Sequence, residues 1–107
     1  MEESNLCNVV NVLYYLYFEN RELVYHFERI WDDAGMTYKD EEYSYIFLGV
    51  SKNFDVDLEA YIFLCDNYII EQSSGNEHES IYILTENYRI ILANLFKNKK
   101  EHKVITE

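Results

Sequence analysis

Proline is absent from this chain of 107 residues, and glycine occurs only at positions 35, 49 and 75. Both residue types interrupt regular structure, so their scarcity leaves few places where the chain must break. Long helices with short connections are therefore the first expectation, and Gly35, Gly49 and Gly75 mark the expected breaks. The length suits a single hydrophobic core and is too short for two.

Composition and charge restrict the classes of protein to which the chain can belong. Apolar residues make up 49% of it and charged residues 27%, which excludes intrinsic disorder. The formal net charge of −11 opposes loose adhesion to nucleic acid or anionic lipid. No apolar run is long enough to cross a bilayer, and the start Met1–Ser4 lacks the basic residues of a signal peptide. We therefore expect a cytoplasmic protein with no membrane partner, in which Cys7 and Cys65 are two buried thiols rather than a disulfide.

The spacing of apolar residues predicts a mainly α, α+β fold. Three- and four-residue steps indicate helices over residues 6–18, 21–34, 42–48, 54–67 and 85–96. A polar connection is expected over residues 36–42. Apolar runs at 68–72 and 80–84, separated by a polar loop at 73–79, predict a β-hairpin. We expect residues 1–96 to form one domain and residues 97–107 to form a charged C-terminal tail.

Three short segments carry a resemblance to a known family. Leu48-Gly49-Val50-Ser51 is similar to the turn of a helix-turn-helix, Asp66–Ile70 to the junction between recognition helix and wing, and Tyr82–Glu86 to the run that ends the wing. Over residues 42–96 the chain thus resembles the winged helix-turn-helix domains of bacterial and archaeal regulators. The resemblance implies a two-stranded wing, flanking helices, a positive φ at Gly49, a left-handed Asn67, and a helix over 54–67 that would enter a DNA major groove.

The charges on that helix argue against DNA reading. No Lys or Arg lies between residues 53 and 67, and carboxylates brought close to phosphates are repelled. We therefore expect a non-enzymatic interaction module that binds a basic protein and imitates the charge of DNA, through Asp55, Asp57, Glu59, Asp66, Glu77 and Glu79. The alternative is a small DNA-binding transcriptional regulator that uses Ser51, Lys52, Asn53, Lys97, Lys99 and Lys100.

The sequence contains no pattern for catalysis or for a cofactor. His26, His78 and His102 fall on separate predicted elements without metal-ligand spacing, so we expect no metal, and we expect His26 to be a satisfied, partly buried side chain. Eleven tyrosines exceed what an ordinary core needs, and tyrosine suits interfaces. Because the terminal helices of winged-helix proteins commonly pair, we predict a homodimer with its interface at Tyr14, Tyr17, Leu92 and Phe96.

Overall fold

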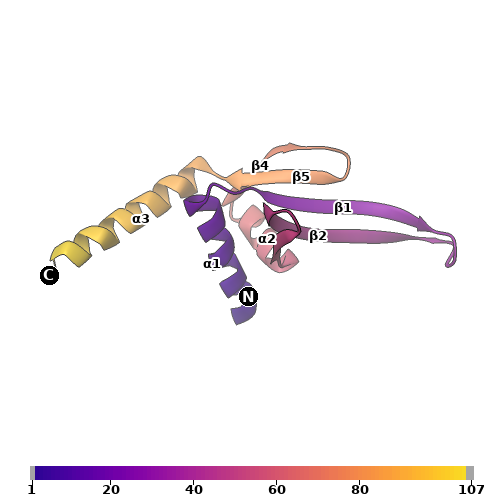
Figure 1. The fold of residues 1–107 in the computed structure, drawn as a ribbon, viewed down its shortest axis with the longest axis horizontal. Coiled ribbons are helices and arrows are strands. Elements are labelled where there is room, and N and C mark those ends of the chain that lie inside the picture. The colour runs from indigo at the N-terminus through magenta and orange to yellow at the C-terminus, as the bar shows by residue number, and fades with distance from the viewer. Residues whose placement is uncertain (1, 106–107) are drawn as a thin grey trace.

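A computed structural model describes the backbone of residues 2–105 and the side chains of residues 2–97. Eight elements follow in the order α1 (Glu3–Phe18), β1 (Leu23–Asp32), β2 (Thr37–Gly49), β3 (Lys52–Val56), α2 (Leu58–Asp66), β4 (Ile70–Gly75), β5 (Glu79–Leu84) and α3 (Glu86–Ile105). The strands form one antiparallel sheet in the order β3-β2-β1-β5-β4. The domain measures 67 × 29 × 29 Å, because a hairpin and a helix project in opposite directions (Figure 1).

The core lies where α1 and α2 pack against one face of the sheet. Leu23 and Ile46, which are paired across β1 and β2, are fully buried together with Leu16 of α1 and Leu64 of α2. Asn8 ties α1 to the start of α2, because its Oδ1 accepts the backbone N–H of Asp57 at 2.9 Å. This contact satisfies one of the free N–H groups at the start of a helix.

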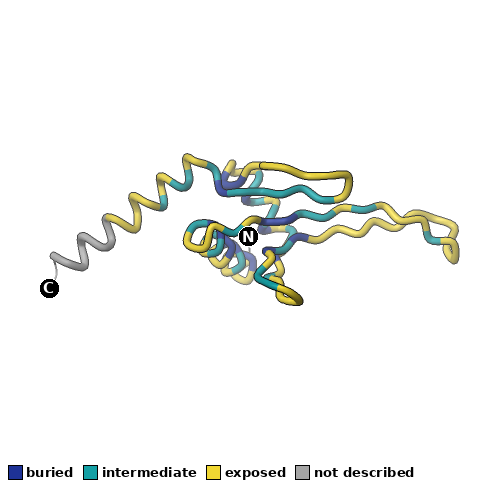
Figure 2. The backbone as a smooth tube through the Cα atoms, turned by 45° about the horizontal axis from the view of Figure 1, so that its top comes forward, coloured by how far each residue is buried: buried dark blue, intermediate teal, exposed yellow. Residues whose placement is uncertain are grey.

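Beyond this core, β1 and β2 continue as a two-stranded arm, which we define as residues 27–44 (Figure 1). The arm is mostly exposed, whereas burial is concentrated at its root (Figure 2). Only the root of β1 is also paired with β5, from Leu23↔Tyr82 to His26↔Glu79.

The winged helix-turn-helix prediction is wrong. Most of residues 21–34 and all of residues 42–48, which were expected to be helices, belong to β1 and β2, and the expected connection at 36–42 is part of β2 from Thr37 onward. The apolar residues of both segments are largely aromatic or β-branched, such as Val24, Phe27 and Trp31, and these side chains favour a pleated sheet. Pairing of the two segments over ten residue pairs, from Leu23↔Ile46 to Asp32↔Thr37, overrides the helical spacing. The fold is therefore a five-stranded α+β sheet, not a helical domain with a two-stranded wing.

The conformations of the turns that suggested a winged helix also differ from those expected for that fold. Ser51 adopts the left-handed conformation with φ 60°, Gly49 does not, and Ser51 leads into β3 rather than a helix. The left-handed residue after α2 is Tyr68, with φ 56°, whereas Asn67 has φ −97°. The predicted helix over 54–67 is shortened because Phe54 pairs with Ile46 as part of β3.

Other predicted elements are confirmed within the described residues. The first helix, the hairpin of β4 and β5, and the last helix are present, although α3 continues past Phe96 to Ile105. The two cysteines are not joined, but Cys7 is exposed rather than buried. Burial raises the pKa of the half-buried Cys65 thiol. Within the described chain, none of the helices has the length and apolar character needed to cross a bilayer.

Candidate functional site

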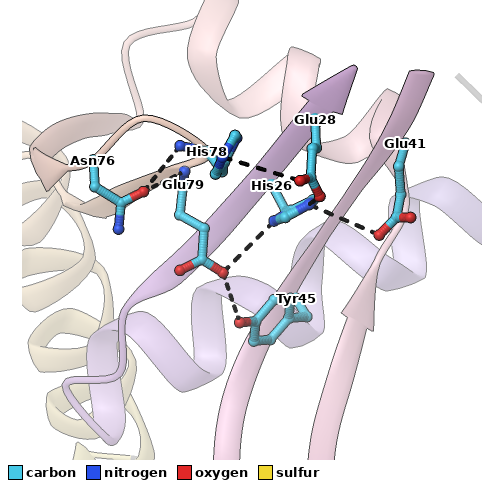
Figure 3. A network of polar contacts seen from close by, with 7 residues as sticks. All are labelled: His26, Glu28, Glu41, Tyr45, Asn76, His78 and Glu79. Atoms are coloured by element: carbon cyan, nitrogen blue, oxygen red, sulfur yellow. Dashed lines mark hydrogen bonds and ion pairs between the residues drawn. The ribbon is translucent and has the colours of Figure 1, made fainter. Parts of the chain in front are cut away.

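A cluster of histidine and glutamate side chains lies on the sheet face opposite the helices. Side chains alternate along a strand, so His26 and Glu28 of β1 share one face, and the register places Glu41 of β2 directly opposite Glu28. Glu79 of β5 lies opposite His26 on the other side of β1. Three neighbouring strands thus bring three carboxylates around one imidazole (Figure 3).

The carboxylates approach both nitrogens of the His26 ring. Nε2 lies 3.6 Å from an oxygen of Glu28 and 3.8 Å from one of Glu41, while Nδ1 lies 3.8 Å from an oxygen of Glu79. His78 joins the cluster from the β4–β5 turn, with its Nε2 4.0 Å from Glu28 (Figure 3). All of these separations exceed the 2.7–3.2 Å of an ordinary N–H···O hydrogen bond.

His26 is covered but not satisfied. Its side chain is 12% exposed, its ring stacks on Tyr43 with centroids 4.6 Å apart, and neither ring nitrogen has a hydrogen-bond partner within the described residues. The prediction of a partly buried His26 is confirmed, but the prediction that it is satisfied is wrong. An unpaired buried polar group costs about 1–3 kcal/mol, and like charges opposite each other, as at Glu28 and Glu41, add to this. A cation bound between these groups would stabilise such an arrangement.

Hydrogen bonds with Asn76 and Tyr45 position the β4–β5 turn and the Glu79 side chain of the cluster. Asn76 Oδ1 accepts the backbone N–H groups of His78 and Glu79 at 2.9 and 3.0 Å. Tyr45 donates its hydroxyl to Glu79 at 3.5 Å, and burial followed by the charge of Glu79 raises the pKa of Tyr45. Glycine is required at position 75, the last residue of β4, because a Cβ there would lie 2.7 Å from the carbonyl oxygen of Glu79.

A second candidate site is an apolar groove between α1 and α3. It encloses about 220 Å³ and is lined by Val10, Leu13, Tyr14, Tyr17, Phe18, Leu92 and Phe96. The four residues of the predicted dimer interface all line this groove, and Phe96 stacks on Tyr17 with centroids 5.7 Å apart. On α1 the groove continues into a stripe of half-exposed apolar side chains at four-residue steps, namely Leu6, Val10, Tyr14 and Phe18. This stripe is separate from the buried stripe of α1, which contains Val9, Val12 and Leu16.

The residues predicted to bind a basic partner do not form one surface on a recognition helix. Asp55 lies on β3, while Asp57, Glu59 and Asp66 lie at or on α2, with Glu59 accepting a hydrogen bond from Asn5. Glu77 lies in the β4–β5 turn, and Glu79 belongs to the His26 cluster. The first four are exposed.

The residues predicted for DNA contact are also placed differently. Ser51, Lys52 and Asn53 form the β2–β3 turn and the start of β3, not the entrance of a helix. Lys97 is exposed on α3. Lys99 and Lys100 continue α3, and their side chains, like that of His102, lie outside the described residues.

Sequence reasoning missed the His26 cluster for a definite reason. As a helix, residues 21–34 separate His26 from Glu28 by about 200° around the axis. As a strand, the same two residues lie side by side, so the pattern His-x-Glu was the available signal. Glu41 and Glu79 become neighbours only through the pairing register, which the sequence alone does not reveal.

Comparison with known proteins adds no assignment to this geometry. Neither the protein-family models, nor the curated proteins, nor the solved structures contain a match to the chain. Its function must therefore be argued from its own surfaces.

Proposed function

We propose that this chain is a non-enzymatic protein-interaction module whose acidic arm binds a basic protein partner. The observation that carries the proposal is the charge balance of the arm. Residues 27–44 contain six carboxylates and only two cations, Arg29 and Lys39. An exposed ribbon with this balance attracts a basic surface and repels a polyanion.

Both cations of the arm are already paired with carboxylates of the arm. Arg29 contacts Asp40 through two hydrogen bonds of 2.7 and 3.1 Å, and this contact lowers the pKa of Asp40. Lys39 lies 3.2 Å from Asp32. The remaining four carboxylates, those of Glu28, Asp33, Glu41 and Glu42, have no cation of the arm within 4.0 Å in the part of the chain that the structure describes.

The end of the arm adds an apolar contact surface to this charge. Trp31 and Tyr38 pack edge to face with centroids 5.0 Å apart, and both are about half exposed or more. Met36 in the turn and Ile30 on the other face of β1 are exposed as well. Aromatic side chains surrounded by charges are typical of the energetic centre of a protein interface. This combination favours a protein partner whose surface is basic around an apolar patch. Toward such a partner the acidic arm would imitate the negative charge of DNA.

The same proposal includes self-association through the α1–α3 groove. The groove is lined by apolar side chains and adjoins an exposed apolar stripe, and contiguous apolar surface of this kind often marks an interaction site. A second copy can cover it by a twofold arrangement in which each chain presents the same helices. Dimerisation would present two arms to the partner and increase avidity.

The test measures binding of a fluorescent lysine-rich peptide to the full chain by anisotropy, at low and at moderate salt. Two doubly substituted proteins carry the same change in net charge. Asp33→Lys/Glu42→Lys changes the arm, and Glu71→Lys/Glu86→Lys changes β4 and α3. We expect the arm variant to weaken binding at least about tenfold, since each reversed close pair is worth about 1 kcal/mol or more, and the other variant to weaken it far less.

Duplex DNA is measured in the same assay, because it tests the regulator alternative. Equal loss in both variants would show that only net charge matters and would reject the arm as the binding surface. Tighter binding to duplex DNA than to the peptide at low salt would overturn the proposal and favour gene regulation.

A further inference from the structure

The His26 cluster has the donor atoms and the layout of a metal site, which goes beyond the proposed interaction function. We infer that His26, Glu28 and Glu41 bind a divalent metal ion of the zinc class, with His26 Nε2 and one oxygen from each glutamate as ligands. These three donor atoms all lie within 4.8 Å of one another. The site uses Glu28 and Glu41 of the arm, so a bound ion would lower the negative charge of the arm, but it uses no residue of the α1–α3 groove and does not depend on self-association.

The distances around Nε2 fit an ion better than they fit hydrogen bonds. Zinc binds histidine nitrogen at about 2.0–2.1 Å and carboxylate oxygen at about 2.0–2.2 Å, so two ligands of a tetrahedral site lie about 3.4 Å apart. The observed separations of 3.6 and 3.8 Å from Nε2 to Glu28 and Glu41 are close to this value. Small movements of two glutamate side chains on the open sheet face would complete the geometry.

The opposite side of the ring supports the same assignment. Metal-binding histidines commonly donate their second N–H to a carboxylate, which fixes the ring and the tautomer. Glu79 lies 3.8 Å from Nδ1 and is itself contacted by the Tyr45 hydroxyl, so it is placed to accept that N–H (Figure 3). Nδ1 would then carry the proton, and the Nε2 lone pair would face the two other glutamates.

The surroundings leave a route for the ion and a fourth ligand position. The Glu41 side chain is 51% exposed, so the site opens to solvent on the β2 side, while Tyr43 covers the ring. Water can occupy the fourth position, because His78, although its Nε2 lies 4.0 Å from Glu28, is not among the donors that lie within 4.8 Å of one another. A doubly charged ion would also offset the repulsion between Glu28 and Glu41, which face each other across the strands.

The experiment measures Zn²⁺ binding to the full chain by competition with a chromogenic chelator, and the Co²⁺ absorption spectrum reports the coordination geometry. The variants are His26→Gln and Glu41→Gln, and Glu79→Gln tests the positioning role of that carboxylate. The matched control is Glu42→Gln, which removes the neighbouring charge on the opposite face of the same strand. Circular dichroism checks the fold of each variant.

We expect one ion per chain, an affinity at least about tenfold lower in His26→Gln and Glu41→Gln, about 10–100-fold lower in Glu79→Gln, and within about twofold of the parent in Glu42→Gln. The absence of saturable Zn²⁺ binding would overturn the inference. So would an unchanged affinity in folded His26→Gln or Glu41→Gln, or an equal loss in Glu42→Gln, because the ion would then bind elsewhere or respond to general charge alone.

Discussion

Phe18 offers the sharpest quantitative test of self-association through the α1–α3 groove. It lies at the end of the exposed α1 stripe, packs on Phe96 with centroids 5.0 Å apart, and is 53% exposed. A Phe side chain offers about 150–250 Å², so roughly 100 Å² of Phe18 remains for a second copy to cover. At about 25 cal/mol per Å², full coverage is worth about 2.5 kcal/mol in each chain.

In a twofold dimer the substitution Phe18→Ser removes this contribution twice, which gives about 5 kcal/mol and between about three and four powers of ten in the dissociation constant. Sedimentation equilibrium over a concentration series measures the change, and circular dichroism confirms that the variant folds. The control is Val50→Ser, which changes a residue that is 92% exposed in the β2–β3 turn. A parent protein that stays monomeric at all concentrations, or a folded Phe18→Ser variant with unchanged association, would refute the reasoning.

Three further predictions concern the stability of the fold. Leu64→Ala, at a fully buried position of α2, should lower the free energy of unfolding by about 2–5 kcal/mol in urea titrations, and a loss under about 1 kcal/mol would contradict its place in the core. Burial, together with a 2.7 Å hydrogen bond to Glu42, raises the pKa of Tyr25 to about 12. Because unfolded tyrosine ionises near pH 10, stability should fall between about pH 10 and 12, and an absorbance titration should show one fewer late-ionising tyrosine in Tyr25→Phe than in the parent. Asn8→Ala should lower stability by about 1 kcal/mol in thermal unfolding, since it leaves the Asp57 N–H at the start of α2 without its acceptor, and an unchanged melting temperature would argue against this contact.

The sequence predicted the parts of the fold that depend on local signals. The apolar spacing of α1 and the polar loop between β4 and β5 are properties of short segments, and both elements are present, although α1 begins at Glu3 and the strands shorten the loop to residues 76–78. The region from 21 to 48 was misread because its apolar residues satisfy helical spacing as well as strand preference. Whether this region forms a helix or a strand is decided by pairing with residues far along the chain, such as that of Leu23 with Ile46, and no local pattern contains that information.

Of the two candidate sites, the one that depends on local signals was predicted from the sequence and the one that depends on strand pairing was not. Tyr14, Tyr17, Leu92 and Phe96 were grouped from the excess of aromatic residues on helices that do form, and these four residues line one groove. His26 and its carboxylates were not grouped, because their contact depends on the register of three strands. The resemblance to a winged helix failed for a related reason, since short turn sequences such as Leu48–Ser51 serve a hairpin as well as a pair of helices.

The length of the arm has a consequence for its own dynamics. From Glu28 to Asp32, β1 pairs with β2 alone, so this ribbon has no third strand to support it. An isolated two-stranded hairpin is marginally stable in water, and segments with few buried contacts open with free energies far below that of global unfolding. The amide protons at the tip should therefore exchange with solvent long before those of the root at Leu23 and Ile46. A ligand that binds the tip must therefore also offset the conformational entropy that the tip loses on binding.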